Sequence, residues 1–91
     1  MKVYFNTALD KYQNAFISLD LDIIPRVGEK VEVLDSLISH FKNQKLPISL
    51  EVVSVTYHIQ TNVIYDQYVT IELWYNKTDL EIMKVSNINP F

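Results

Sequence analysis

The chain has no cysteine and only one glycine among its 91 residues. Without cysteine, neither a disulfide nor a thiolate-bound metal can stabilise the fold, and no thiol can act as a nucleophile. With one glycine, the glycine-rich loops that hold phosphates and the G-x-S-x-G turn of serine hydrolases cannot form. The sequence therefore excludes cysteine catalysis, P-loops and dinucleotide-binding loops.

Clusters of basic residues and long apolar runs are also missing. The eight lysine and arginine residues are scattered singly, and the net charge is −3. Because phosphate binding needs basic side chains gathered on one face, the sequence argues against a nucleic-acid partner. No apolar run reaches the length of about 18 residues that a membrane span needs. The first residues lack the apolar core of a signal peptide, so we expect a cytoplasmic protein.

The composition is rich in apolar and aromatic residues, at 48% and 12%. This is sufficient for one core, and we expect a single domain over residues 1–85 followed by a flexible tail at 86–91. Alternation of apolar and polar residues predicts β-strands. The predicted strands are 2–7, 15–22, 31–33, 48–59, 68–75 and a short edge strand at 80–85.

One segment has a helical period instead. Leu34, Leu37, Ile38 and Phe41 recur at the spacing of one helix face. We predict a short helix at about residues 35–43, with Asp35 as its N-cap and Asn43 in the left-handed position after its end.

Two local features predict how the sheet bends. Pro25 and Gly28 predict a specified turn that leads into the strand at 31–33. The apolar positions change parity between Val52 and Val53, which predicts a β-bulge. The expected fold is mainly β with one inserted short helix, as a strongly bent antiparallel sheet or a partly open small barrel.

Carboxylates and histidines offer a weak case for chemistry. Asp20 and Asp22 are two residues apart on a predicted strand, a spacing that could serve acid–base work or hold a cation. His40 and His58 have no second ligand at metal-binding spacing, although Glu72 could lie across from His58 if the two long strands pair. We favour a solvated strand face for the two aspartates and structural or exposed roles for the two histidines, and we expect no catalytic residue, no metal and no cofactor.

Aromatic side chains give the best indication of a contact surface. Tyr68 and Trp74 lie on the outward face of the strand at 68–75, where they either bind a partner or pack beneath the helix and a loop. Arg26 is the only arginine and stands in the predicted turn. Its guanidinium could hold an anion, or it could tie the turn to loop carbonyls or to Glu29.

The residues Pro25-Arg26-Val27-Gly28-Glu29-Lys30-Val31 match the pattern P-R-x-G-[ED]-x-[VI]. Together with the apolar runs at 52–58 and 69–73, this pattern resembles a group of small uncharacterised bacterial and phage proteins. The segment from Gly28 to Val33 is also similar to the first strand of Src-homology-3-like small barrels, from which this chain differs by its helix after Val33. The resemblance implies a fold and a bacterial or phage setting, but no reaction.

Three functions remain as hypotheses. The preferred one is a non-enzymatic interaction module that contacts a protein partner or a second copy of itself, with Tyr68, Trp74 and Arg26 as candidate contacts. The alternative is a small barrel that binds nucleic acid, which the acidic composition disfavours. The third is a hydrolytic or metal-dependent enzyme built on Asp20, Asp22 and a histidine.

Overall fold

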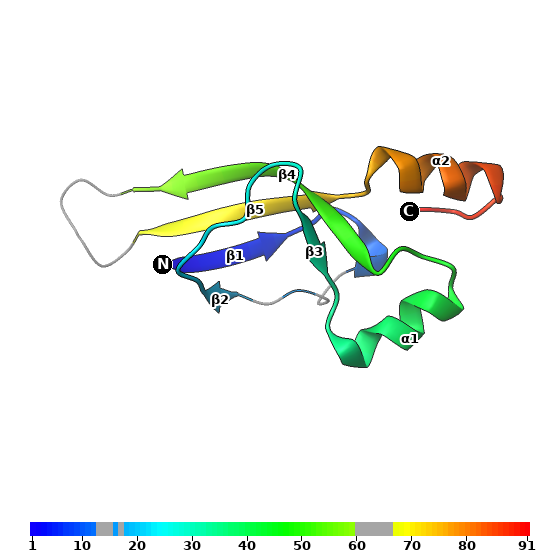
Figure 1. Ribbon diagram of the computed structural model, residues 1–91, viewed down its shortest axis with the longest axis horizontal. Helices are drawn as coiled ribbons and strands as arrows, with labels where there is room; N and C mark the ends of the chain where they lie inside the picture. The colour runs from blue at the N-terminus through cyan, green and yellow to red at the C-terminus, as the bar shows by residue number, and fades with distance from the viewer. Residues whose placement is uncertain (13–15, 17, 60–66) are drawn as a thin grey trace.

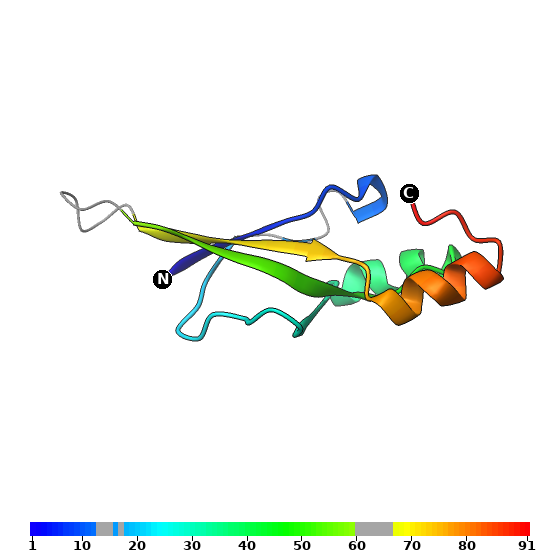
Figure 2. The ribbon, with the colours of Figure 1, turned by 90° about the horizontal axis from the view of Figure 1, so that it is seen from above.

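The computed structural model describes residues 1–12, 16, 18–59 and 67–91. Five strands, two α-helices and one short 3-10 helix (η1, Asp10–Tyr12) are found in this part of the chain. The strands and α-helices are β1 (Lys2–Asn6), β2 (Leu19–Asp20), β3 (Lys30–Glu32), α1 (Asp35–Asn43), β4 (Ser49–His58), β5 (Tyr68–Trp74) and α2 (Lys77–Val85). Both α-helices lie at the same end of the sheet (Figures 1 and 2).

The strands form one sheet in the order β2-β1-β5-β4-β3, which curls into a half-barrel. The predicted fold class, a mainly β protein with a strongly bent, partly open sheet, is confirmed. The sheet is mixed, however, because β1 and β5 pair in parallel while the other described pairs are antiparallel. Parallel strands need a long connection, and β1 is joined to β5 through all the elements between them in the sequence. A tight turn therefore does not force this pair to be antiparallel.

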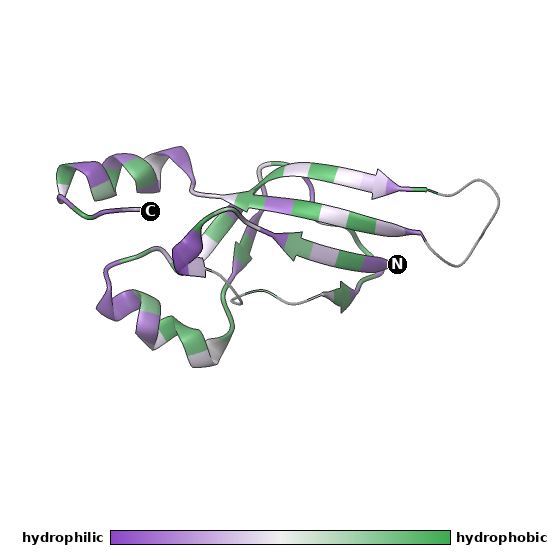
Figure 3. Ribbon diagram, turned by 180° about the vertical axis from the view of Figure 1, so that it is seen from behind, coloured by the Kyte–Doolittle hydropathy of each residue, from purple (hydrophilic) through white to green (hydrophobic). Residues whose placement is uncertain are grey.

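The core lies on one face of β5, the central strand. Val69, Ile71 and Leu73 are fully buried, and they alternate with residues that are exposed or partly buried. The hydropathy of β5 alternates in the same way (Figure 3). Because Val3 lies beside Val69, and Leu73 lies beside Val52, the same face continues onto β1 and β4. Among the described residues, the other buried apolar side chains are Leu9, Tyr12, Val33, Phe41, Leu46, Leu50, Tyr75 and Met83.

The helix predicted over 35–43 is confirmed as α1, but its caps differ from the prediction. The N-cap is Leu34, not Asp35, and Leu34 is half exposed. At the other end the left-handed residue is Lys45, with φ 58°, rather than Asn43. The amides of Lys45 and Leu46 donate to the carbonyls of Lys42 and Phe41, the bonding pattern of a Schellman motif.

Both local features predicted for the bend are present. Gly28 has φ 94°, and the amide of Glu29 donates to the carbonyl of Arg26 across the turn. The register between β4 and β5 shifts between Val52 and Ser54, which leaves Val53 as the extra residue of a bulge. The parity change in the sequence therefore corresponds to a real slip in the ladder.

The strand predicted at 80–85 is wrong, because this segment forms α2. The side chain of Asn76 accepts a hydrogen bond from the Thr78 amide at 2.8 Å and caps the helix. Leu80 and Met83 then face the core, at helical spacing. Of the strand predicted at 15–22, only Leu19–Asp20 is assigned to a strand, and residues 13–15 and 17 lie outside the described residues.

The segment predicted as a tail folds back along α2 toward the sheet. Its contacts include a hydrogen bond from the Tyr75 hydroxyl to the Pro90 carbonyl at 2.6 Å. The Phe91 ring lies against the single tryptophan, Trp74, with 5.8 Å between ring centroids. The amide of Ile88 donates to the carbonyl of Met83, so α2 ends in the same pattern as α1.

Candidate functional site

The register of the sheet separates two faces. The inner face carries the buried residues of β5, Val69, Ile71 and Leu73, and the outer face carries the residues between them. Residues paired directly across two strands share a face, so Val55 and Tyr57 of β4 belong to the inner face beside Ile71 and Val69.

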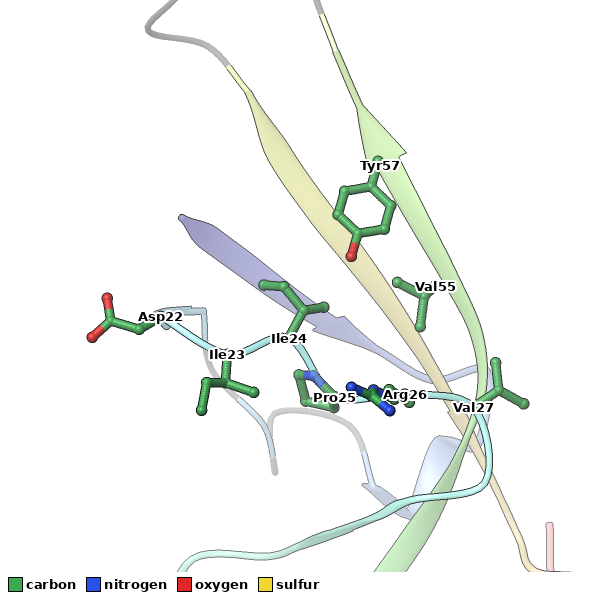
Figure 4. Close-up of a pocket in the computed structure, with 8 residues that line it drawn as sticks. All are labelled: Asp22, Ile23, Ile24, Pro25, Arg26, Val27, Val55 and Tyr57. Carbon is green, nitrogen blue, oxygen red and sulfur yellow. The ribbon is translucent and has the colours of Figure 1, made fainter.

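The loop between β2 and β3 crosses over the inner face and leaves an open groove against β4 (Figure 4). Val55 and Tyr57 form the β4 side of this groove, and the loop forms the other side. The loop residues that line it are Asp22, Ile23, Ile24, Pro25, Arg26 and Val27. Here Pro25 and Gly28, predicted only as a structural turn, hold the loop at the edge of the groove.

Apolar side chains in the groove are unusually exposed. Ile23 is 84% exposed, Val27 64% and Tyr57 54%, although the inner face is elsewhere the core of the molecule. Such a gathering of exposed apolar groups is typical of a contact surface. A smaller apolar patch occurs on α2, where Ile82 and Val85 point away from the core.

Arg26 lines the groove. It contacts Glu29, but through its backbone and not through the guanidinium considered in the sequence analysis. The backbone amide of Arg26, rather than its guanidinium, donates to Oε1 of Glu29 at 2.5 Å. No carboxylate among the described residues lies within ion-pair distance of the guanidinium. The Arg26 side chain therefore places a positive charge at a mainly apolar surface. Asp22, with a negative charge, lies at the other end of the same loop (Figure 4).

The outer face carries a small aromatic cluster around Tyr68. Its ring stacks on His58, with centroids 4.2 Å apart, and meets the edge of Tyr4 at 5.3 Å. His58 also forms a 2.9 Å hydrogen bond with Thr70. The register therefore sets Tyr68, not Glu72, across from His58. Sequence reasoning missed Tyr4, which only the parallel pairing of β1 and β5 brings to this cluster.

Trp74 does not belong to that cluster. It lies six residues further along β5, which is about 20 Å of extended strand. Its side chain is partly buried and packs against the core, with ring contacts to Tyr75 and Phe91. The two aromatic residues predicted as one contact surface thus lie at opposite ends of the strand.

The carboxylates and histidines proposed for chemistry are dispersed. Asp20 accepts a 3.0 Å contact from the Met1 amino group, while Asp22 lies beyond β2 in the loop. His40 contacts Gln44 on the surface of α1 at 3.0 Å. Among the residues that the structure describes, no three histidine, aspartate or glutamate side chains gather as a metal would require.

The outer edge of β4 is only partly covered by β3. The two strands pair from Ser49 to Glu51, and Gly28 and Glu29 then exchange two backbone hydrogen bonds with Val52. Beyond that point the chain turns away over the inner face. Within the described part of the chain, the edge from Val53 to His58 has no strand beside it. This bare edge adjoins the groove, because Val55 and Tyr57 belong to both.

Comparison of the chain with protein-family models found no match, and comparisons with curated proteins and with solved structures found none either. The resemblance to Src-homology-3-like barrels and to small bacterial and phage proteins therefore stays a prediction. No helix in the described residues is long and apolar enough to cross a membrane.

Proposed function

We propose that this protein is a non-enzymatic interaction module that binds an extended polypeptide in the groove and along the bare edge of β4. The observation that carries the proposal is the exposure of Ile23, Val27 and Tyr57 at a groove that opens beside an unpaired strand edge. Strand addition uses this combination: the edge supplies backbone hydrogen bonds, and neighbouring pockets receive alternate side chains.

The outer face supports the alternative function less well. The Tyr4, His58 and Tyr68 rings could stack on unpaired bases. The cation near them is Lys2, whose Nζ lies 5.2 Å above the Tyr4 ring. A backbone-tracking site needs a groove lined with several positive charges, and the chain as a whole has a net charge of −3. A polypeptide is therefore the favoured partner.

A displayed library of random short peptides tests the proposal. Selection on the wild-type protein should enrich peptides in which apolar residues alternate, and synthetic copies of these should bind in solution. Replacing Ile23 and Tyr57 together by serine should weaken that binding about tenfold or more, because both side chains line the groove.

The matched control replaces Ile82 and Val85 of α2 by serine, since these two residues are as exposed as Tyr57 and Ile23. This control should leave peptide binding unchanged. Equal loss in both double variants would contradict the proposal. Binding of heterogeneous single-stranded DNA or RNA with a steep dependence on salt would favour the nucleic-acid alternative instead.

A further inference from the structure

We infer that the polypeptide bound at the β4 edge is β4 of a second copy of this chain, paired in the antiparallel direction. The inference rests on the proposed function and names the partner for the same site. β3 occupies the edge position beside β4 only as far as Glu51, and the Gly28–Val52 hydrogen bond closes that pairing.

The segment from Val53 to His58 then offers about 20 Å of strand edge in line with β3. A strand added there would continue the position that β3 leaves. Its inner-face side chains would lie beside Val55 and Val27, which already line the groove together (Figure 4). The added strand therefore covers the apolar groups that the fold leaves exposed.

Charge distinguishes this edge from the two ends of the sheet. Edge strands are usually protected against pairing by charged residues. β2 carries Asp20, and β3 carries Lys30 and Glu32. No aspartate, glutamate, lysine or arginine occurs from Val52 to Tyr65. The exposed part of β4 thus lacks the charged residues that β2 and β3, the two end strands of the sheet, carry.

An uncharged edge suits a second copy in particular. A two-fold axis through an antiparallel strand pair brings the residues at its centre near their own counterparts, so any charge there would meet the same charge. An axis perpendicular to the sheet also keeps the inner faces of both copies on one side. With Thr56 on the axis, Val55 lies opposite Tyr57 of the second copy, and Tyr57 opposite the second Val55. Such pairs of β-branched and aromatic residues stabilise antiparallel strands.

Charge replacement at Thr56 tests this arrangement by sedimentation velocity. Thr56 is an exposed residue opposite Thr70. The wild-type protein should dimerise as its concentration rises from micromolar to millimolar. Thr56→Lys and Thr56→Glu should each weaken dimerisation about tenfold or more, because like charges would meet across the axis. An equimolar mixture of the two variants should dimerise again, as a heterodimer.

Ser39→Lys and Ser39→Glu are the matched controls, since Ser39 is exposed on α1. They should dimerise as the wild type does. In the wild-type protein itself, exchange of the amide hydrogens from Val53 to His58 should slow as the concentration rises, a readout that needs no variant.

A wild-type protein that stays monomeric at millimolar concentration overturns the inference. If the selected peptides still bind the groove in that case, the proposed function stands with a different partner. Dimerisation that is indifferent to both Thr56 variants also overturns the inference, because the interface would then lie elsewhere.

Discussion

The amide of Gly28 donates a hydrogen bond to the carbonyl of Val52, with 2.9 Å between the two atoms. Gly28 is the turn residue with positive φ, and Val52 is the last residue of β4 before its bulge. One contact therefore joins the turn to the bulge and marks where β3 stops covering β4. The loop leaves the sheet edge at this point, and it is this departure that creates both the groove and the bare edge.

Gly28→Ala should destabilise the protein by about 1 kcal/mol or more. The added Cβ would meet no atom within 4 Å, so the cost comes from the backbone at φ 94° alone. Urea unfolding of the two proteins measures the difference. The unfolding free energy of Gly28→Asn should lie between those of the wild type and Gly28→Ala, because asparagine tolerates positive φ better than alanine does. Equal stabilities of all three would contradict the turn argument.

Lys45→Gly should stabilise the protein by about 0.5–1 kcal/mol. Lys45 adopts φ 58° at the end of α1, a conformation that suits glycine better than a residue with a Cβ. Thermal unfolding is the measurement, and Lys42→Gly, within the same helix, is the control that should destabilise. A loss of stability in Lys45→Gly would show that the unfolded-state entropy of glycine outweighs the strain.

Stability should fall as the pH rises above 10.0, the ordinary pKa of tyrosine. Burial raises the pKa of Tyr12, whose ring stacks on Phe41 and whose hydroxyl donates to the Pro47 carbonyl. The unfolded chain then loses a proton that the folded chain keeps, so each pH unit costs up to about 1.4 kcal/mol for this tyrosine.

Denaturant unfolding at a series of alkaline pH values measures that slope. Tyr12→Phe should reduce this slope, because it removes the tyrosine whose pKa burial raises. The slope is the readout because Tyr12→Phe also removes the hydrogen bond to Pro47 and lowers stability at every pH. An unchanged slope in Tyr12→Phe would contradict the role of this residue.

Removing residues 88–91 should lower the melting temperature and shift the fluorescence of Trp74 to longer wavelength. The truncation deletes the Phe91 ring contact with Trp74, and Trp74 is the only tryptophan, so the emission reports this site alone. Val85→Ala, at an exposed position on α2, is the control. Unchanged emission in the truncated protein would instead support the flexible tail predicted from the sequence.

Trp74→Ala should destabilise by about 2 kcal/mol, as expected for a partly buried large aromatic. Tyr68→Ala should cost about 1 kcal/mol, because it loses the stack on His58 and its side chain is already 37% exposed. Urea denaturation compares the two variants. Neither should alter dimerisation, since both residues belong to β5, which pairs with the side of β4 opposite the bare edge. Weaker dimerisation of folded Tyr68→Ala would move the contact surface to the outer face.

The predicted helix at 35–43 and the bulge at Val52–Val53 were readable from the sequence because each has a local cause. The helix repeats apolar residues at a helical spacing, and the bulge changes the parity of a strand. The segment 80–85 was misread because its alternation also fits a helix that leaves Ile82 and Val85 exposed. The cap at Asn76 was the available signal for that helix.

The candidate site was harder to predict from the sequence than these local elements. Tyr68 and Trp74 were correctly placed on the side of β5 opposite Val69 and Leu73, but the partial burial of Trp74 could not be foreseen, because the Phe91 ring of the tail packs against it. The groove was not predicted at all. Ile23, Ile24 and Val27 belong to a loop without periodicity, so nothing in their order shows that the loop crosses the inner face.

By itself the sequence determined what depends on neighbours along the chain: the strands near 2–7, 48–59 and 68–75, the helix at 35–43, the turn at Gly28 and the bulge. The spacing of side chains and the φ preference of glycine act over a few residues, so they can be read directly. The tertiary structure alone decided the parallel pairing of β1 with β5, the path of the loop over the inner face, and the bare edge of β4. These depend on which distant segments bury their apolar faces together, and many such arrangements satisfy the same local pattern.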